Sequence, residues 1–93
     1  MKIVTLIPPK VYNTHMEYVD VEAFLVLDTG EEYKRTWHYN LFTFEFWDGD
    51  ITYSPDSESD FDEPDKPVPD IVTKEFQRLR DWGFEAAANV NRD

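Results

Sequence analysis

The carboxylates of residues 45–65 are the side chains whose type and spacing could do chemistry. This segment contains nine Asp or Glu residues and no Lys or Arg, so it carries −9 of the formal net charge of −11. In an extended chain, residues two apart project to the same side about 6.6–6.8 Å apart. Asp56, Glu58, Asp60 and Asp62 would then form one row. Alternate phosphates of a B-DNA strand repeat at about 6.8 Å, so such a row could occupy a DNA-binding groove.

We therefore predict a partner-binding surface that combines these acids with neighbouring aromatic residues. Phe61 interrupts the acidic run, and such aromatics can fill a pocket on a partner. The charge suits a basic nucleic-acid-binding protein or enzyme. The alternative is a solvated linker over 55–66, with Trp47 and Tyr53 in ordinary core or cross-strand packing. The predicted contacts are Glu45, Trp47, Asp48, Asp50, Asp56, Glu58, Asp60, Phe61, Asp62, Glu63 and Asp65.

Catalytic and metal-binding patterns are poorly represented. The chain has no cysteine, and its two histidines, His15 and His38, have no recognisable motif around them. We expect His38 on the solvent side of a strand or at an interface, and His15 in an exposed loop. An EF-hand register counted from Asp56 places Phe61 where Gly is needed and Pro67 where Glu is needed. We predict no enzyme activity, no cofactor and no metal site, with a calcium-dependent module as an alternative.

The elements that must position the acids are read from apolar periodicity. Residues 2–7 are mostly β-branched or apolar, and this strand is expected to end at the two prolines that follow. Alternation predicts strands at 19–27 and 31–47, joined by a turn at 28–30. The apolar phase changes near 40–42, which predicts a bulge, a bend or a short turn there. Asp48-Gly49 predicts a hairpin between 44–46 and 51–53.

The C-terminal half reads as an acidic loop followed by one helix. Residues 54–69 hold four prolines and six acids, which indicates a loop or a partly disordered arm. Asp70 is the expected N-cap and Gly83 the expected helix end, with 84–93 as a short helix or a frayed tail. The fold class is α+β: one domain, with an antiparallel sheet of four to five strands and one helix packed on one face. The predicted helix stripe is Ile71, Val72, Phe76, Leu79 and Trp82.

Composition argues against several classes of function. Direct binding to nucleic acid or to an anionic membrane needs clustered Lys and Arg, which an acidic chain does not offer. No apolar run approaches the length of a membrane span, and the start does not read as a signal peptide. We expect a reducing, cytoplasmic setting, which is the host cytoplasm if a phage encodes the chain.

A small, cysteine-free, strongly acidic α+β domain without a catalytic motif is similar in kind to phage-encoded inhibitors of host defence enzymes. Anti-restriction proteins, anti-CRISPR proteins and uracil-DNA glycosylase inhibitors share this profile. The resemblance is one of size and composition, and it implies a non-enzymatic inhibitor that acts as a DNA mimic. The alternative is a small adaptor or immunity-type protein that binds its partner through an aromatic sheet surface. A sheet face or an edge strand could also form a homodimer.

Overall fold

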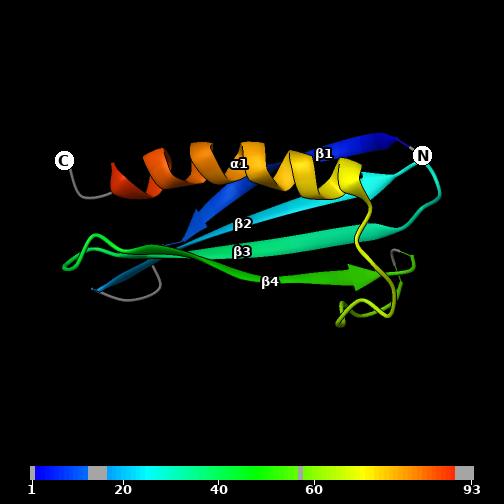
Figure 1. Cartoon of the computed structure of the whole chain (residues 1–93), viewed down its shortest axis with the longest axis horizontal. Helices are drawn as coiled ribbons and strands as arrows, with labels where there is room; N and C mark the ends of the chain where they lie inside the picture. Colours follow the sequence, from blue (N-terminus) through cyan, green and yellow to red (C-terminus); the bar gives the residue numbers. More distant parts are fainter. Residues whose placement is uncertain (1, 13–16, 57, 90–93) are drawn as a thin grey trace.

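The chain folds into one antiparallel sheet covered by one helix, as the sequence predicts. The computed structural model describes residues 2–12, 17–56 and 58–89. In Figure 1, α1 lies along one face of the sheet, which we call the inner face, and the other is the outer face. The strands, in the spatial order β1-β2-β3-β4, and the helix are β1 (Ile3–Tyr12), β2 (Tyr18–Leu27), β3 (Glu32–Asn40), β4 (Phe46–Ser54) and α1 (Asp70–Ala88).

The core lies between the inner face and α1. Side chains of a strand alternate between faces, so the odd positions of β2 and β3 point toward the helix. The Phe76 ring of α1 meets the Trp37 ring of β3 edge-on, with centroids 6.1 Å apart. The predicted helix stripe is thus correct for Phe76 but wrong for Ile71 and Trp82, which are 36% and 45% exposed. The buried apolar residues are Val19, Val21, Ala23, Leu25, Leu27, Tyr33, Trp37, Tyr39, Val72, Phe76, Leu79 and Ala87.

β1 continues through the two prolines at 8–9, so the predicted break there is wrong. Its pairing with β2 shifts register between Ile7 and Lys10, which is where the prolines lie. β1 is an edge strand, and only one side of an edge strand needs ladder hydrogen bonds. Proline is tolerated in that position because its missing N–H need not belong to the ladder.

The chain reverses at residues 41–45, not at Asp48-Gly49, so the predicted Asp-Gly hairpin is wrong. The Asn40 side-chain oxygen accepts hydrogen bonds from the N–H groups of Phe42 (2.9 Å) and Thr43 (3.0 Å). The Asn40 N–H donates to the Glu45 carbonyl at 2.8 Å and closes the turn. This turn therefore explains the change in apolar phase near residues 40–42. Asp48-Gly49 instead lies inside β4, where the register with β3 shifts between Arg35 and Trp37.

α1 runs through Gly83 instead of ending there. Gly83 is buried, and a Cβ atom at this position would lie 3.0 Å from Val21 Cγ1, so the glycine allows the helix to approach β2 closely. Residues 84–88 continue the helix, and 90–93 lie outside the described residues. The N-cap is Pro69, and Asp70 is the first helical residue, where its charge suits the helix dipole. This helix is not long and apolar enough to cross a membrane.

Candidate partner-binding site

The acidic loop between β4 and α1 wraps around the edge of β4. Phe61 packs on the outer face, with its ring 5.8 Å from the Phe24 ring and 4.9 Å from Lys34 Nζ. Asp62 and Tyr53 then exchange two backbone hydrogen bonds of 2.7 and 2.8 Å, which form an isolated antiparallel bridge at the edge. Val68 packs against the core on the inner face. Phe61 is thus a contact within the chain, and it is half-buried.

The start of the loop is a compact turn, so the extended row of carboxylates is wrong. The Asp56 side-chain oxygen accepts hydrogen bonds from the N–H groups of Glu58 (2.9 Å) and Ser59 (3.0 Å). The hydroxyl of the fully buried Ser54 is directed at the carbonyls of Asp56 and Ser59. An Asp that satisfies its own backbone in this way is typical of turns. The carboxylate of Asp56 therefore shapes the loop.

The end of the loop is tied to the turn between β2 and β3 through Glu31. Lys66 Nζ lies 3.0 Å from Glu31 Oε2, and the Tyr53 hydroxyl donates to the same oxygen at 2.9 Å. Thr29 donates to the other oxygen at 2.8 Å. These contacts lower the pKa of Glu31, and the contact with Lys66 has the largest effect. The contact between Glu31 and Lys66 also raises the pKa of Lys66. The ionised form of the Glu31 carboxyl therefore stabilises the loop more than the protonated form does.

We expect the stability that Glu31 provides to depend on pH. Because the folded-state pKa lies below the ordinary value of 4.5, this stability is present above that pH and is lost as the pH falls through the lowered pKa. In urea unfolding, wild type should exceed Glu31→Gln in stability at pH 7, and the difference should shrink below pH 4.5. Lys66→Gln should reproduce this behaviour. Parallel pH profiles for wild type and Glu31→Gln would show that the contact is not formed.

Five of the predicted acids line one hollow beside this loop, and we call it the acidic hollow. Its volume is about 650 Å³, and Tyr53, Pro55 and Ser59 complete its lining. All five carboxylates belong to exposed residues, and within the described ranges none of them forms an ion pair. No three His, Cys, Asp or Glu of the described chain are arranged to hold a metal ion. The five acids are Glu58, Asp60, Asp62, Glu63 and Asp65.

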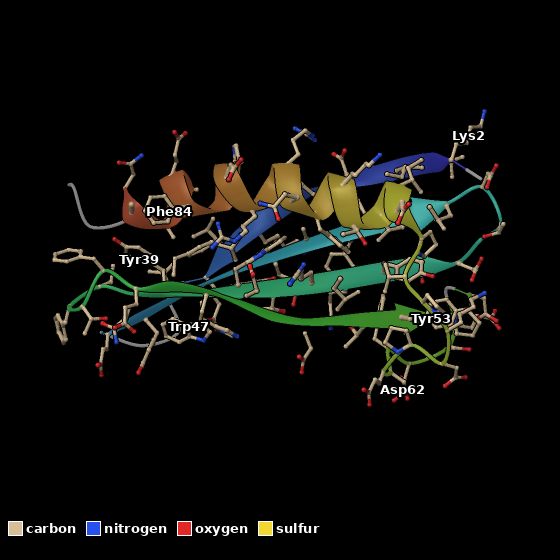
Figure 2. All side chains as sticks on the ribbon, in the orientation of Figure 1. Lys2, Tyr39, Trp47, Tyr53, Asp62 and Phe84 are labelled. Atoms are coloured by element: carbon tan, nitrogen blue, oxygen red, sulfur yellow. The ribbon has the colours of Figure 1, made fainter. Side chains whose placement is uncertain are left out.

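The other predicted contacts do not join this hollow. Asp50 lies in a neighbouring groove that Glu63 also lines. Asp48 points to the inner face and accepts a hydrogen bond from Arg80 Nε at 2.8 Å, with Arg35 Nη2 at 3.8 Å, so its charge is compensated within the fold. Trp47 lies six positions before Tyr53 on β4, which corresponds to about 20 Å along a strand. Trp47 is therefore far from the acidic hollow, which Tyr53 lines. Figure 2 shows Trp47 and Asp62 well separated along the molecule.

Sequence reasoning missed an exposed aromatic turn, residues 41–45, at the same end as α1's C-terminus (Figure 1). Phe42 is 68% exposed and Phe44 is 72% exposed, although the turn is well hydrogen-bonded. Phe44 has a φ of 61°, a left-handed conformation that is uncommon for a bulky residue. Glu45 belongs to this turn. The sequence feature that indicates this turn is the change in apolar phase near residues 40–42. A turn at that point places Phe42 and Phe44 outside both neighbouring strands.

His38 lies on the outer face, as expected. Its Nδ1 is 2.7 Å from Asp20 Oδ1 on the adjacent strand, and its ring is 5.9 Å from the Trp47 ring. His15 lies outside the described residues.

The comparisons with known proteins add no relative from which a site could be transferred. No protein-family model matches the chain, and no curated protein or solved structure matches it either.

Proposed function

We propose that this chain is a non-enzymatic inhibitor whose acidic hollow binds the basic nucleic-acid-binding surface of a larger protein. The observation that supports it is the set of five exposed carboxylates around one hollow, without ion-pair partners in the described chain. A surface that binds phosphates is rich in Lys and Arg, and it would complement this set. The resulting attraction speeds association and weakens with added salt.

The way in which the loop is held favours a binding role over that of a solvated linker. Phe61 fixes the loop on the outer face, the Asp62–Tyr53 bridge fixes it at the edge, and the Lys66–Glu31 pair fixes its end. A linker that only keeps the protein soluble needs no such attachments. A pre-folded loop loses less conformational entropy when a partner binds, which favours affinity.

A DNA mimic of the phage anti-defence type is the kind of inhibitor that we propose. Because the chain turns at Asp56, the proposal rests on clustered charge and not on a regular phosphate-like repeat. Such a mimic competes with DNA for one groove, so DNA and salt should both displace its partner.

The experiment is affinity capture of the tagged chain's partner from a bacterial lysate, at low and high salt and with excess duplex DNA. The test variant carries Asp60→Asn and Asp62→Asn. The control variant carries Asp81→Asn and Glu85→Gln, which lie on α1. Each double variant changes the formal net charge equally, from −11 to −9. A general effect of net charge would therefore weaken partner capture by both variants.

We expect capture of a nucleic-acid-binding protein that either high salt or DNA displaces. Each exposed ion pair contributes up to about 1 kcal/mol, so the test variant should bind that partner roughly tenfold more weakly. The control variant should bind as wild type does. Equal binding by the test variant and wild type would exclude the acidic hollow as the contact.

The exposed aromatic turn supports a second candidate function, an adaptor or immunity-type protein. Two Phe side chains held in a fixed, hydrogen-bonded turn are suited to fill an apolar pocket on a partner. The same capture distinguishes this function with a variant carrying Phe42→Ser and Phe44→Asn, since Asn tolerates a positive φ. An adaptor should lose its partner in this variant and keep it in the presence of DNA. A DNA mimic should show the reverse.

A further inference from the structure

The groove that contains Asp50 lies along the outer edge of β4, and we call it the β4 groove. Its volume is about 580 Å³. Residues 49–52 of β4 line one side, and residues of the loop segment 63–68 line the other. β4 is an edge strand, and within the described part of the chain β3 is its one strand neighbour. The groove therefore runs beside the edge of β4 that faces away from β3.

The backbone of Ile51 faces this groove. Successive residues of an antiparallel strand direct their N–H and C=O groups to opposite edges. Tyr53 exchanges backbone hydrogen bonds with Asp62, so its groups point away from β3. Ile51 is two positions earlier, in the same register with β3, so its groups point the same way. Among the described residues, none beyond this edge donates to or accepts from the backbone of Ile51.

The loop cannot supply the missing partner, because of Pro64. If the pairing of Asp62 with Tyr53 continued as an antiparallel ladder, residue 64 would lie opposite Ile51. Proline has no N–H to donate to the Ile51 carbonyl. The loop pairs with β4 at the Asp62–Tyr53 bridge, and Pro64 lines the groove instead of extending that bridge. The space beside Ile51 is thus open to a strand from another chain.

The side chains that line the groove leave an excess of negative charge. Its two cations already face carboxylates of the fold, with Arg35 Nη2 at 3.8 Å and Lys66 Nζ at 3.0 Å. Asp50 and Glu63 are both exposed, and neither forms an ion pair with a described residue. A strand that enters the groove therefore gains from basic side chains.

We propose that the β4 groove binds an extended segment of a partner protein in which an aliphatic residue is flanked by Lys or Arg. The aliphatic residue exchanges both backbone hydrogen bonds with Ile51, so the segment adds a strand to the sheet. Its side chain lies beside those of Ile51 and Val68, which pack against the core. The flanking basic residues complement Asp50 and Glu63.

Strand addition goes beyond the function proposed above. It depends on the backbone of Ile51, and it does not require that the partner bind nucleic acid. The β4 groove adjoins the acidic hollow, since Glu63 lines both. One basic partner can therefore place a strand in the groove and the rest of its surface on the hollow.

The test is an NMR titration of the full chain, labelled with ¹⁵N, with the peptide acetyl-Ser-Lys-Val-Lys-Ser-amide. The amide signals of Ile51 and Thr52 are followed, because the Ile51 N–H faces the groove and the Thr52 N–H faces β3. One matched peptide is methylated on the backbone nitrogen of its Val, which removes the donor to the Ile51 carbonyl. A second has Glu in place of both Lys, which reverses the charge.

We expect a saturable shift of the Ile51 signal, with a Kd of roughly 0.1–1 mM. At a peptide concentration of ten times Kd, hydrogen exchange of the Ile51 N–H should slow about tenfold, because about one molecule in eleven remains free. Exchange of the Thr52 N–H should change less than about twofold, since β3 already accepts that hydrogen bond. The methylated peptide and the Glu peptide should each bind about tenfold more weakly.

Two double variants of equal net charge test the carboxylates. Asp50→Asn with Glu63→Gln should weaken binding of the Lys peptide roughly tenfold, because two exposed ion pairs are lost. Asp81→Asn with Glu85→Gln is the control, since both residues lie on α1 and neither lines the groove. It should bind the peptide as wild type does.

Three results would overturn the proposal. One is equal affinity for the methylated and unmethylated peptides. Another is unchanged affinity in the variant with Asp50→Asn and Glu63→Gln, shown to be folded by its thermal melt. The third is protection of the Ile51 N–H that rises with protein concentration in the absence of peptide, because it would assign the groove to a second copy of this chain.

The variant with Asp60→Asn and Asp62→Asn separates this proposal from the function proposed above. Both residues line the acidic hollow and not the β4 groove. The variant should therefore keep its affinity for the Lys peptide within about twofold. A failure of the acidic hollow in partner capture is thus distinguishable from a failure of strand addition.

Discussion

Phe76→Ala is expected to lower the free energy of unfolding by about 3–5 kcal/mol, a large share of the 5–15 kcal/mol typical of a domain. Phe76 is fully buried, and its ring packs edge-on against Trp37 at 6.1 Å. Removing the ring leaves a cavity that collapses only partly, because most of the other core side chains are held by β2 and β3. Urea unfolding monitored by Trp fluorescence measures the loss as a lower midpoint with an unchanged slope.

Phe84→Ala is the matched control for this substitution. Phe84 is on the same helix and also packs against aromatic rings, those of Tyr39 (5.8 Å) and Phe46 (5.4 Å), but it is 42% exposed. A half-exposed ring removes less apolar surface from water, so its loss should cost less than half as much. Equal losses in the two variants would mean that α1 is not held on the sheet mainly through Phe76.

The parts of the fold that follow from local periodicity could be predicted. The odd positions from Val19 to Leu27 are all buried, because an antiparallel strand with one covered face alternates regularly. The spacing of Val72, Phe76 and Leu79 likewise placed one helix on that face. These signals are contained within a single element, so no knowledge of its neighbours is needed to read them.

The candidate site depends on contacts between residues far apart in the chain, which periodicity does not contain. Asp48 is compensated by Arg80, 32 positions later, so its charge in the sequence overstates what a partner can reach. Phe61 resembles a free anchor in the sequence, but the fold places it against Phe24 and Lys34. The segment of high negative charge was visible, and the division of its acids between structural and exposed roles was not.

Gly49→Ala is expected to destabilise the fold by about 1–3 kcal/mol, the usual cost of forcing extra atoms into a packed region. A Cβ atom at Gly49 would lie 2.5 Å from the Thr36 carbonyl oxygen and 3.2 Å from His38 Nε2. The contact is this close because Gly49 and Asp50 lie opposite the single residue Thr36, at the register shift in β4. β3 cannot move away easily, since β2 pairs with its other edge.

Asp50→Ala is the control for this substitution. It tests whether the loss of stability arises from the close contact at Gly49 or from any substitution in this segment. Asp50 is exposed, so its loss should change stability by no more than about 0.5 kcal/mol. Equal effects of the two substitutions would contradict a close contact between Gly49 and β3 at the bulge. Because Trp47 and Asp48 adjoin Gly49, displacing β4 should also disturb the Trp47–Tyr18 ring contact and the Asp48–Arg80 pair. A shifted Trp47 indole signal in folded Gly49→Ala would show that the bulge positions the Trp47 ring.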